Sequence, residues 1–357
     1  MENQTVKAQT VVAFGEPLEE RISELHRPTG KQVLVRVHSC GLCHSDLHFH
    51  EGHLNLGGGN SLPLAALGVN LPFVLGHEPF GVIVDFGPEA GLVEADRGRP
   101  VIVYPWIGCG DCEYCNRGLD HQCGSPQVIG MQQPGGQADH LLVREPKFLI
   151  EARGVDPLLA GPYACSGLTS FSALKKLDGR QDQWIAIIGA GGVGMMALAI
   201  AKGSGFQKVA VVDVNDERLK VAADQYGADL TINSSTPDAA NRLREATGGL
   251  AGVVDFVGAP ATAEFALDQL KTSGKLVIVG LFGGEAHVSL PLLAIRQVSI
   301  AGSFVGSLDE MVELMTYVRA GAIKPIPVQE VPIGEVNEAI QLLRAGKVNG
   351  RLVLTHD

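Results

Sequence analysis

A glycine-rich turn in the second half of the chain joins an apolar stretch to a helix-forming one. Residues 188–195 read I-G-A-G-G-V-G-M, so Gly189, Gly191 and Gly194 fit the spacing G-x-G-x-x-G. At this spacing the first glycine permits a tight turn, the second lets a pyrophosphate approach the backbone, and the third lets a helix pack close to a sheet. The spacing alone is weak, because glycines gather in any tight turn, so its surroundings decide what it means.

Apolar strands and helices alternate around this turn. We expect strands at 184–188, 209–212, 230–233 (a short one), 253–257 and 275–279. The helices expected between them lie at 195–203, 217–226 and 261–270. This alternation predicts a parallel, doubly wound sheet with helices on both faces. The turn then connects the first strand to the first helix, which is where a dinucleotide-binding turn lies.

An acidic residue ends the second strand of this series. The strand closes with V-V-D, and Asp213 lies nineteen residues after Gly194. A carboxylate in this place accepts hydrogen bonds from the adenosine ribose of NAD and repels the 2′-phosphate of NADP. Arg218, five residues later, would soften that preference. The sequence therefore favours NAD.

The first 160 residues have a different pattern of apolar, Gly and Pro residues. Strand-like segments at 32–38, 81–86 and 101–104 are broken by Gly and Pro, which predicts a mostly β domain. Residues 54–71 are expected to form a long surface loop. The chain ends with expected helices at 308–320 and 335–345 and a strand at 351–355. A length of 357 residues suggests two domains.

Charge and hydropathy disfavour several classes of partner. The chain has 28 Lys and Arg against 39 Asp and Glu, giving a net charge of −11, and we find no basic run. This balance argues against a nucleic-acid or anionic-membrane partner. The first residues lack the apolar region of a secretory signal, and no stretch is long and apolar enough for a membrane span. We therefore expect a cytoplasmic protein.

Four of the seven cysteines lie within fifteen residues. Cys109, Cys112 and Cys115 have the spacing C-x2-C-x2-C, and Cys123 follows after seven residues. Four thiolates from one loop are typical of a closed, structural Zn²⁺ site. An iron–sulfur cluster is the alternative, since ferredoxins share part of the spacing. The seven-residue gap and the absence of a following C-P favour zinc.

A second possible metal set is dispersed along the chain. Cys43 lies in G-L-C-H-S-D-L, His77 in L-G-H-E, and Cys165 in A-C-S-G-L-T. Two thiolates and one imidazole with an open fourth position match one known form of catalytic zinc site. Spacing cannot establish that the three residues meet, and a lone histidine is more often a packed residue than a ligand.

These motifs occur in the order found in zinc-dependent medium-chain alcohol dehydrogenases, and the chain resembles that family over essentially its whole length. The resemblance implies a GroES-like, mostly β catalytic domain and a Rossmann NAD-binding domain, an α/β fold. The implied limits are 1–166 and 307–357 for the catalytic domain and 167–306 for the Rossmann domain. It also implies two zinc ions per chain, one catalytic and one structural.

The resemblance assigns the residues of the catalytic zinc site. Cys43, His77 and Cys165 correspond to the metal ligands. Glu78 corresponds to an acidic residue that can transiently approach the metal and so joins the metal set. Asp46 corresponds to the carboxylate that orients the ligand histidine, as outer-shell carboxylates often do.

Proton transfer and cofactor contacts are assigned in the same way. Ser45 and His48 correspond to a relay that carries the alcohol proton to solvent, and they join the three zinc ligands as catalytic residues. The residues expected to contact the cofactor are His44, Thr169, Gly189, Gly191, Gly192, Val193, Gly194, Asp213, Arg218, Val257, Val279, Leu281 and Arg351. Cys40 is expected to be packed on the preceding strand, while His50 and His53 are left without a role, as candidate surface residues.

The implied reaction is reversible hydride transfer between a primary or secondary alcohol and NAD⁺, giving an aldehyde or ketone and NADH. The leucines of residues 54–71 favour medium-chain or aromatic alcohols only weakly. A polyol or diol dehydrogenase of the same superfamily is the main alternative, although Cys165 and the whole cysteine quartet argue against it. A silent NAD-binding protein is less favoured, since it need not keep the catalytic set. Partners are a small-molecule substrate and further copies of the chain, a tetramer being favoured over a dimer, with contact at 284–303 around a short β run at 287–290.

Overall fold

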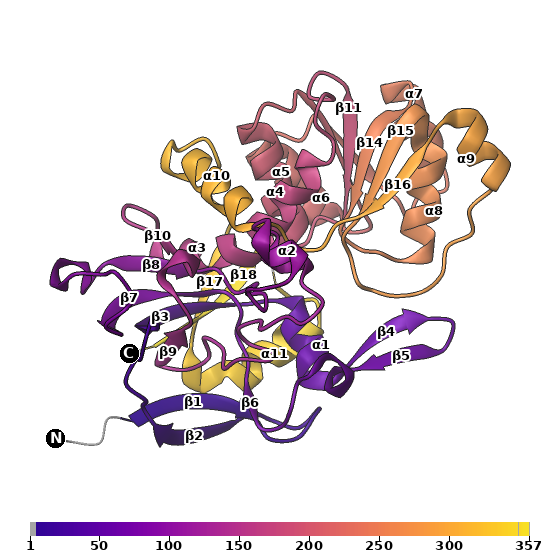
Figure 1. Ribbon diagram of the computed structural model, residues 1–357. Coiled ribbons are helices and arrows are strands. Elements are labelled where there is room, and N and C mark those ends of the chain that lie inside the picture. Colours follow the sequence, from indigo (N-terminus) through magenta and orange to yellow (C-terminus); the bar gives the residue numbers. More distant parts are fainter. Residues whose placement is uncertain (1–4, 349, 357) are drawn as a thin grey trace.

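Two bodies built on separate sheet systems make up the molecule (Figure 1). The structure, a computed structural model, describes residues 5–348 and 350–356. One body carries a parallel sheet with helices on both sides, and the other is mostly β. The helices are α1 (His44–Glu51), α2 (Glu113–Asn116), α3 (Pro157–Pro162), α4 (Leu168–Lys175), α5 (Gly192–Gly203), α6 (Asp216–Tyr226), α7 (Ala239–Thr247), α8 (Pro260–Gln269), α9 (Leu290–Arg296), α10 (Leu308–Arg319) and α11 (Val336–Arg344).

The parallel sheet has the strand order β13-β12-β11-β14-β15-β16 in the described part of the chain. Each neighbouring pair is parallel. This order runs outward in both directions from the first strand, which is the doubly wound arrangement of dinucleotide-binding folds. The strands are β11 (Trp184–Ile188), β12 (Lys208–Asp213), β13 (Leu230–Asn233), β14 (Leu250–Asp255), β15 (Leu270–Ile278) and β16 (Ser299–Gly302).

The apolar sequence of β11 explains its central place. Ile185 and Ile187 belong to the buried cluster that includes α5 and α6. Ala186 and Ile188 belong to the cluster on the opposite face, with α7 and α8. A strand covered on both faces needs a continuous apolar run because successive side chains point to opposite sides. The predicted parallel sheet is confirmed.

The mostly β body contains one larger sheet and two small ones. The larger sheet has the order β10-β8-β7-β3-β18-β17, with β9 also paired to β3; β2-β1-β6 and the hairpin β4-β5 are separate. The strands of all three sheets in this body are β1 (Thr5–Val11), β2 (Glu19–Glu24), β3 (Val33–Leu42), β4 (His53–Gly57), β5 (Asn60–Pro63), β6 (Phe73–Val74), β7 (Pro79–Phe86), β8 (Pro100–Val103), β9 (His140–Val143), β10 (Leu149–Glu151), β17 (Val328–Pro332) and β18 (Arg351–Thr355).

The two ends of the chain meet in this β body. Strand β18 pairs antiparallel with β3, so that Leu352 lies opposite Leu42, next to Cys43. Helix α10 packs against α4, and the hydroxyl of Tyr104 donates 2.8 Å to the carbonyl of Gly306. The predicted α/β class, with a mostly β part made from both ends of the chain, is confirmed. The domain limits at 166/167 and 306/307 stay a prediction.

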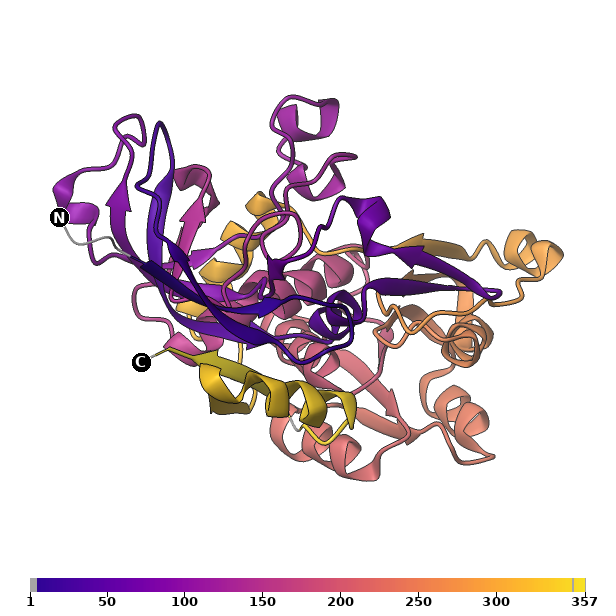
Figure 2. The ribbon, with the colours of Figure 1, turned by 90° about the horizontal axis from the view of Figure 1, so that it is seen from below.

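Residues 54–71 do not form the single long surface loop that we expected. The chain folds into the hairpin β4–β5, followed by a short 3-10 turn (Leu64–Leu67). Three successive glycines at 57–59 have positive φ and let the chain reverse between the two strands. From the sequence, the same glycines had suggested a loop. Figures 1 and 2 show the hairpin reaching toward the parallel-sheet body, and the backbone of Gly57 lies against that of Gly284.

The expected β run at 287–290 is also wrong. Residues 279–289 are irregular, and α9 begins at Leu290 with proline next in the chain. The sheet ends at β16, which pairs only with β15 in the described residues. Because a strand needs a neighbour for its hydrogen bonds, the alternating pattern at 287–290 has no sheet to join.

The glycine turn has the geometry that its spacing predicted. Gly189 has φ +92°, in the left-handed region that side chains rarely adopt. A Cβ on Gly194 would lie 1.7 Å from the carbonyl oxygen of Gly189, whereas a Cβ on Gly191 would meet nothing within 4 Å. The third glycine therefore sets how closely α5 packs, and the second leaves open space beside the turn.

We expect Gly194→Ala to lower the free energy of unfolding by on the order of 3 kcal/mol, because overpacking against backbone cannot relax through a side chain. Gly191→Ala is the matched control: it should keep the melting temperature and weaken NADH binding, since its methyl group fills the space that a pyrophosphate would need. Thermal melts with and without NADH measure both effects. Equal stability of the two variants would contradict this role for Gly194.

Candidate active site

Four buried side chains from separate parts of the chain meet at one point. One ligand atom from each of Cys43, His77, Glu78 and Cys165 lies within 4.8 Å of the others. The two Sγ atoms of Cys43 and Cys165 are 3.9 Å apart. All four residues are almost fully buried. The geometry thus brings together the three predicted zinc ligands and the predicted acidic neighbour.

Local structure explains how Cys43 reaches this point. It lies between β3 and α1 and is the N-cap of that helix. Asp46, three residues later, accepts a hydrogen bond of 2.8 Å from the Cys43 backbone N–H through Oδ2. This is the returning half of a capping box, and it fixes the backbone that carries the Cys43 thiol.

The same carboxylate orients the histidine. Asp46 Oδ1 lies 3.1 Å from Nδ1 of His77, and both residues are fully buried. Although burial opposes a charged ring, Asp46 holds the pKa of His77 well above its ordinary value. Nε2 of His77 has no hydrogen-bond partner among the described residues and turns to the sulfur atoms.

These donors fit a zinc ion. Buried polar atoms normally have a partner, yet Nε2 of His77 and Oε2 of Glu78 have none in the described part of the chain. Two sulfurs and an imidazole nitrogen match the Cys2His catalytic form, and Asp46 supplies the carboxylate that a ligand histidine usually binds. The Cys43 and Cys165 thiols share a hydrogen bond, and it lowers the pKa of Cys43 well below its usual value and, together with burial, raises that of Cys165. A pocket that already favours one thiolate is suited to a cation.

A buried ion pair connects this cluster to the glycine turn. Arg351 of β18 donates to Oε1 of Glu78. Burial raises the pKa of Glu78, and the Arg351 charge opposes that shift. The Arg351 side chain also passes close to Gly192, where an added Cβ would lie 2.9 Å from its Cδ. The residue expected to contact the pyrophosphate therefore touches both the turn and the metal cluster.

The predicted proton relay lies on α1. Oγ of Ser45 is 3.8 Å from Sγ of Cys43. His48, one turn further along the helix, is half-buried, and burial lowers its pKa, with Glu51 opposing. An imidazole with a lowered pKa is neutral at pH 7 and can accept a proton. His44 is exposed at the start of the same helix. Their roles stay predictions.

Cys165 lies in a segment of unusual helical geometry. Residues Tyr163–Gly167 form a π-helix between α3 and α4. Such wide turns often mark functional sites, because they shift the side-chain register of an otherwise regular helix. Burial raises the pKa of Tyr163 to about 12, so its ring is a neutral packing group. Thr169 follows at the start of α4, half-exposed.

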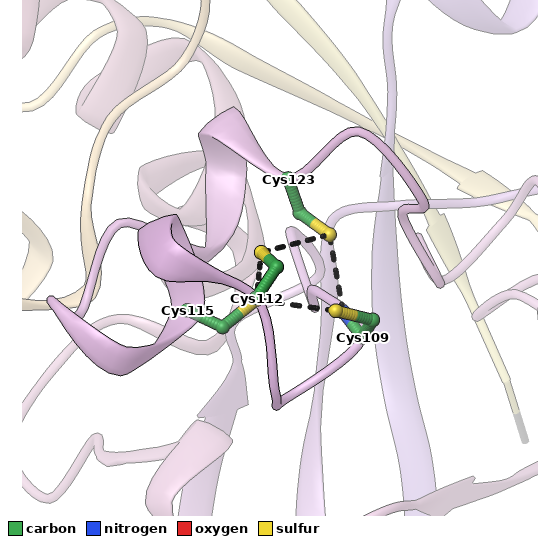
Figure 3. Close-up of side chains that lie close together, drawn as sticks. All are labelled: Cys109, Cys112, Cys115 and Cys123. Carbon is green, nitrogen blue, oxygen red and sulfur yellow. Dashed lines mark hydrogen bonds between the residues drawn. The ribbon is translucent and has the colours of Figure 1, made fainter.

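The second cysteine group forms a compact tetrahedron of thiols. Figure 3 shows the side chains of all four residues converging. Their sulfurs are separated by 3.9 Å (Cys109–Cys115), 3.5 Å (Cys112–Cys115) and 3.8 Å (Cys112–Cys123). Four sulfurs at about 2.3 Å from a central Zn²⁺ would be about 3.8 Å apart. The backbone N–H of Cys115 lowers the pKa of Cys112 to about 7, so a thiolate forms readily.

Around the glycine turn, the predicted contacts are only partly gathered. Oδ2 of Asp213 accepts a 2.6 Å hydrogen bond from the backbone N–H of Ala190, which ties the acid to the turn. Cγ2 of Val257 would lie 2.9 Å from a Cβ on Gly189. Arg218 instead donates to the carbonyl of Gly346, and Leu281 is exposed. Arg218 is thus held at Gly346, and Leu281 is open to solvent.

Sequence reasoning missed Asp255. Its Oδ1 accepts hydrogen bonds from the backbone of Val257 and Gly258, at 2.9 and 3.1 Å. Its carbonyl accepts from Val279 and Gly280. One buried residue thus shapes both segments in which cofactor contacts were expected. The signal was present, since β14 ends in V-V-D as β12 does.

Aromatic side chains beside the metal cluster were missed as well. The rings of Trp106 and Phe49 have centroids 5.5 and 5.9 Å from that of His77. Phe304 lies edge-on to Trp106 at 5.7 Å and is exposed. No spacing in the sequence links these positions, because they come from three separate segments. His50, a candidate surface residue, is in fact buried and bonds the carbonyl of Glu16, whereas His53 is exposed and Cys40 is buried, as expected.

Known proteins resemble this chain over its whole length. Residues 29–153 match the family model "Alcohol dehydrogenase GroES-like domain", and residues 192–319 match "Zinc-binding dehydrogenase". The NAD-dependent alcohol dehydrogenase of Sulfurisphaera tokodaii is 36% identical, covering 98% of this chain and 99% of its own. The enzyme of the same name from Saccharolobus solfataricus is 35% identical, with the same coverage of both chains.

A solved structure agrees with these relatives. The alcohol dehydrogenase from the archaeon Aeropyrum pernix superposes with a TM-score of 0.87 at 30% identity, covering 98% of this chain and 100% of its own. The first matched model includes the segments that hold Cys43 and His77, and the second begins at Gly192, within the glycine turn. The predicted resemblance is confirmed, and the chain belongs to the zinc-dependent medium-chain alcohol dehydrogenases.

Proposed function

We propose that this protein is a zinc-dependent alcohol dehydrogenase that transfers hydride reversibly between a primary or secondary alcohol and NAD⁺. The proposal rests on one observation: the side chains of Cys43, His77 and Cys165 lie together in a buried cluster. Asp46 fixes the positions of Cys43 and His77 by hydrogen bonds to both. The NAD-dependent relatives and the zinc-binding family model support the cofactor and the metal. Zinc bound there would act as a Lewis acid that acidifies an alcohol or polarises a carbonyl.

The chain's own residues would do the remaining work. Asp46 keeps Nε2 of His77 directed at the metal position. Ser45, beside Cys43, takes the proton of the alcohol, and the neutral imidazole of His48 passes it to solvent. Trp106, buried beside His77, excludes water from one side of the site. Asp255 holds the backbone segments that we expect against the nicotinamide.

The aromatic side chains beside the site support medium-chain or aromatic alcohols as substrates. Trp106 and Phe49 lie against His77, and Phe304 extends that wall. Such rings favour an apolar substrate body, whereas a polyol needs polar groups to pair its hydroxyls. A polyol or diol dehydrogenase of the same superfamily is the second candidate, although Cys165 and the cysteine quartet argue against it.

Turnover and metal content test this proposal together. We expect two zinc ions per chain, and a kcat/KM for hexanol and benzyl alcohol at least about tenfold above that for sorbitol, a difference of about 1.4 kcal/mol. His77→Gln should lose one zinc and lower kcat at least about 100-fold. Cys40→Ala, which changes a buried cysteine outside both metal groups, should keep both zinc ions. Two bound zinc ions with no turnover of any alcohol or aldehyde would refute the enzyme.

We further propose that Asp213 selects NAD over NADP. It is largely buried and tied to Ala190, so its charge faces the turn. We expect Asp213→Asn, which keeps an acceptor but removes the charge, to raise the NADP/NAD ratio of kcat/KM about tenfold. Adding Arg218→Gln should reverse part of that gain if Arg218 meets the 2′-phosphate. An unchanged ratio in Asp213→Asn would contradict the assignment.

A homo-oligomer is supported by an apolar surface at the edge of the parallel sheet. Strand β16 is an edge strand in the described residues, and the exposed apolar side chains of this strand and of the preceding helix α9 are Leu290, Leu292, Ile295 and Ile300. Exposed apolar groups on an unpaired strand mark an interaction surface. We propose a tetramer assembled through this edge, the tetrameric state resting on the family resemblance.

Light scattering should give about 150 kDa, four times the chain mass of 37.6 kDa. Ile295→Asp should produce a smaller species, because it places a charge in the contact. Val93→Asp, at an exposed apolar residue of the β body, is the control and should leave the mass unchanged. A monomeric wild-type protein would exclude this contact.

We also propose a cytoplasmic location. All seven cysteines are free thiols, and the six that belong to the two metal groups can bind a metal only while they are reduced. In the part of the chain that the structure describes, no helix has the length and hydropathy needed to cross a membrane. Cell fractionation checks the location, and recovery of the native chain outside the cytoplasm would contradict it.

A further inference from the structure

Trp106 lies between the two groups of metal-ligating side chains. It is almost fully buried, with 3% of the residue exposed. Its ring faces that of His77, with 5.5 Å between the centroids, and its N–H reaches the segment that carries Cys165. Along the chain it stands three residues before Cys109, the first cysteine of the quartet. One residue therefore connects the two metal groups.

The hydrogen bond of the indole fixes the backbone beside Cys165. Nε1 of Trp106 donates 3.0 Å to the carbonyl oxygen of Ala164, inside the π-helix Tyr163–Gly167. A π-turn departs from the regular hydrogen-bond ladder of a helix. A buried carbonyl that loses its partner costs free energy, so this bond from outside the helix favours one position of the turn. The residue that precedes the ligand is held in place by it.

Contact with the indole also restricts the ring of His77. Asp46 binds Nδ1 of this ring at 3.1 Å, which fixes one end of it. The Trp106 ring packs on it at an interplanar angle of 56°, and the Phe49 ring packs on it edge-on at 63°. An imidazole bonded only at Nδ1 could still turn about that bond, whereas rings packed on it at interior density prevent the turn. Nε2 of His77 thus keeps its direction toward the two sulfurs.

The backbone of Trp106 is itself anchored at the base of the cysteine loop. The carbonyl of Pro105 accepts a hydrogen bond of 3.1 Å from Ile129. The carbonyl of Ile107 accepts one of 2.8 Å from Gln127. These two bonds form a stem, and the chain between its two sides holds the cysteine quartet. The loop that carries the quartet therefore also sets the position of the indole.

We propose that Trp106 is a positioning residue for the catalytic metal site, which holds His77 and Cys165 in the geometry that zinc requires. Asp46 supports Cys43 and His77, whereas Trp106 supports His77 and Cys165. Between them, these two residues reach all three ligands. The inference rests on the proposed zinc site, because it concerns two of the ligands of that site. Partners of this kind, one step removed from the metal, change metal affinity or activity 10- to 100-fold when they are replaced.

Cobalt(II) in the catalytic site gives a readout that does not depend on turnover, because its visible absorption follows the arrangement of its ligands. We expect Trp106→Phe to shift these bands, and to make the loss of the catalytic metal to a chelator about tenfold faster. The quartet should keep its metal. Trp184→Phe is the matched control, since it makes the same change at the other tryptophan of the chain, at the start of β11. Its bands and its rate of metal loss should equal those of the wild type.

A replacement that keeps the shape of the ring tests the hydrogen bond without a change in packing. In Trp184→Phe, Trp106 is the one tryptophan left in the sequence. Biosynthetic incorporation of 3-benzothienylalanine at that position exchanges the N–H for sulfur, and we expect a smaller shift of the cobalt bands in the same direction. Unchanged bands in this protein or in Trp106→Phe would overturn the proposal. A wild-type protein that takes up metal at the quartet alone would refute the proposed catalytic site, and this inference with it.

Discussion

A single buried carboxylate, that of Asp46, fixes the geometry on which the metal cluster depends. One oxygen accepts from the backbone of Cys43 and the other meets the ring of His77. The first contact caps α1 and sets the position of a thiol, while the second decides which nitrogen of the imidazole faces that thiol. A charge buried in this way is unfavourable without partners. Its two contacts explain why the helix begins where it does.

The pair of Arg351 and Glu78 extends this organisation across the molecule. Arg351 belongs to the last strand, Glu78 follows a metal ligand, and the arginine also passes the glycine turn at Gly192. A buried ion pair contributes little net stability on its own, because desolvation offsets the attraction. Its clearer effect is positional: the C-terminal strand, the metal cluster and the cofactor turn are held in one arrangement. That is why both ends of the chain are needed in one domain.

Prediction from the sequence was most accurate at positions where a single physical requirement decides which residue type can be present. The glycines at 189 and 194 were correctly read because a positive φ and a close backbone approach exclude other residues. The cluster of the four cysteines at 109, 112, 115 and 123 was also predicted correctly, since their short spacing alone brings four thiols together. The meeting of Cys43, His77 and Cys165 was not a matter of spacing, and only family resemblance anticipated it.

The failures came from contacts between distant segments. The alternation at 287–290 resembled a strand, but strand formation depends on a neighbour that the sheet does not supply beyond β16. The hairpin β4–β5 was missed because its three glycines were read as a flexible loop, whereas their backbone angles reverse the chain. Trp106 has no motif, since its aromatic partners lie in other segments, whereas Asp255 ends its strand in V-V-D as Asp213 does and was overlooked.

Net charge described the molecule less well than the distribution of its charges. The net charge of −11 argued against polyanionic partners. That inference holds for large partners, because a large charged surface interacts with the electric field of the whole molecule. A small ligand in a cleft experiences mainly the groups within a Debye length of about 8 Å. Near Arg36 the charges are mixed, since Arg97 pairs with Asp85 and Glu94, and His140 pairs with Asp139. The net charge of an acidic protein therefore argues against polyanionic surfaces without deciding which charges a small ligand meets in one cleft, because the two kinds of partner sample the field over different distances.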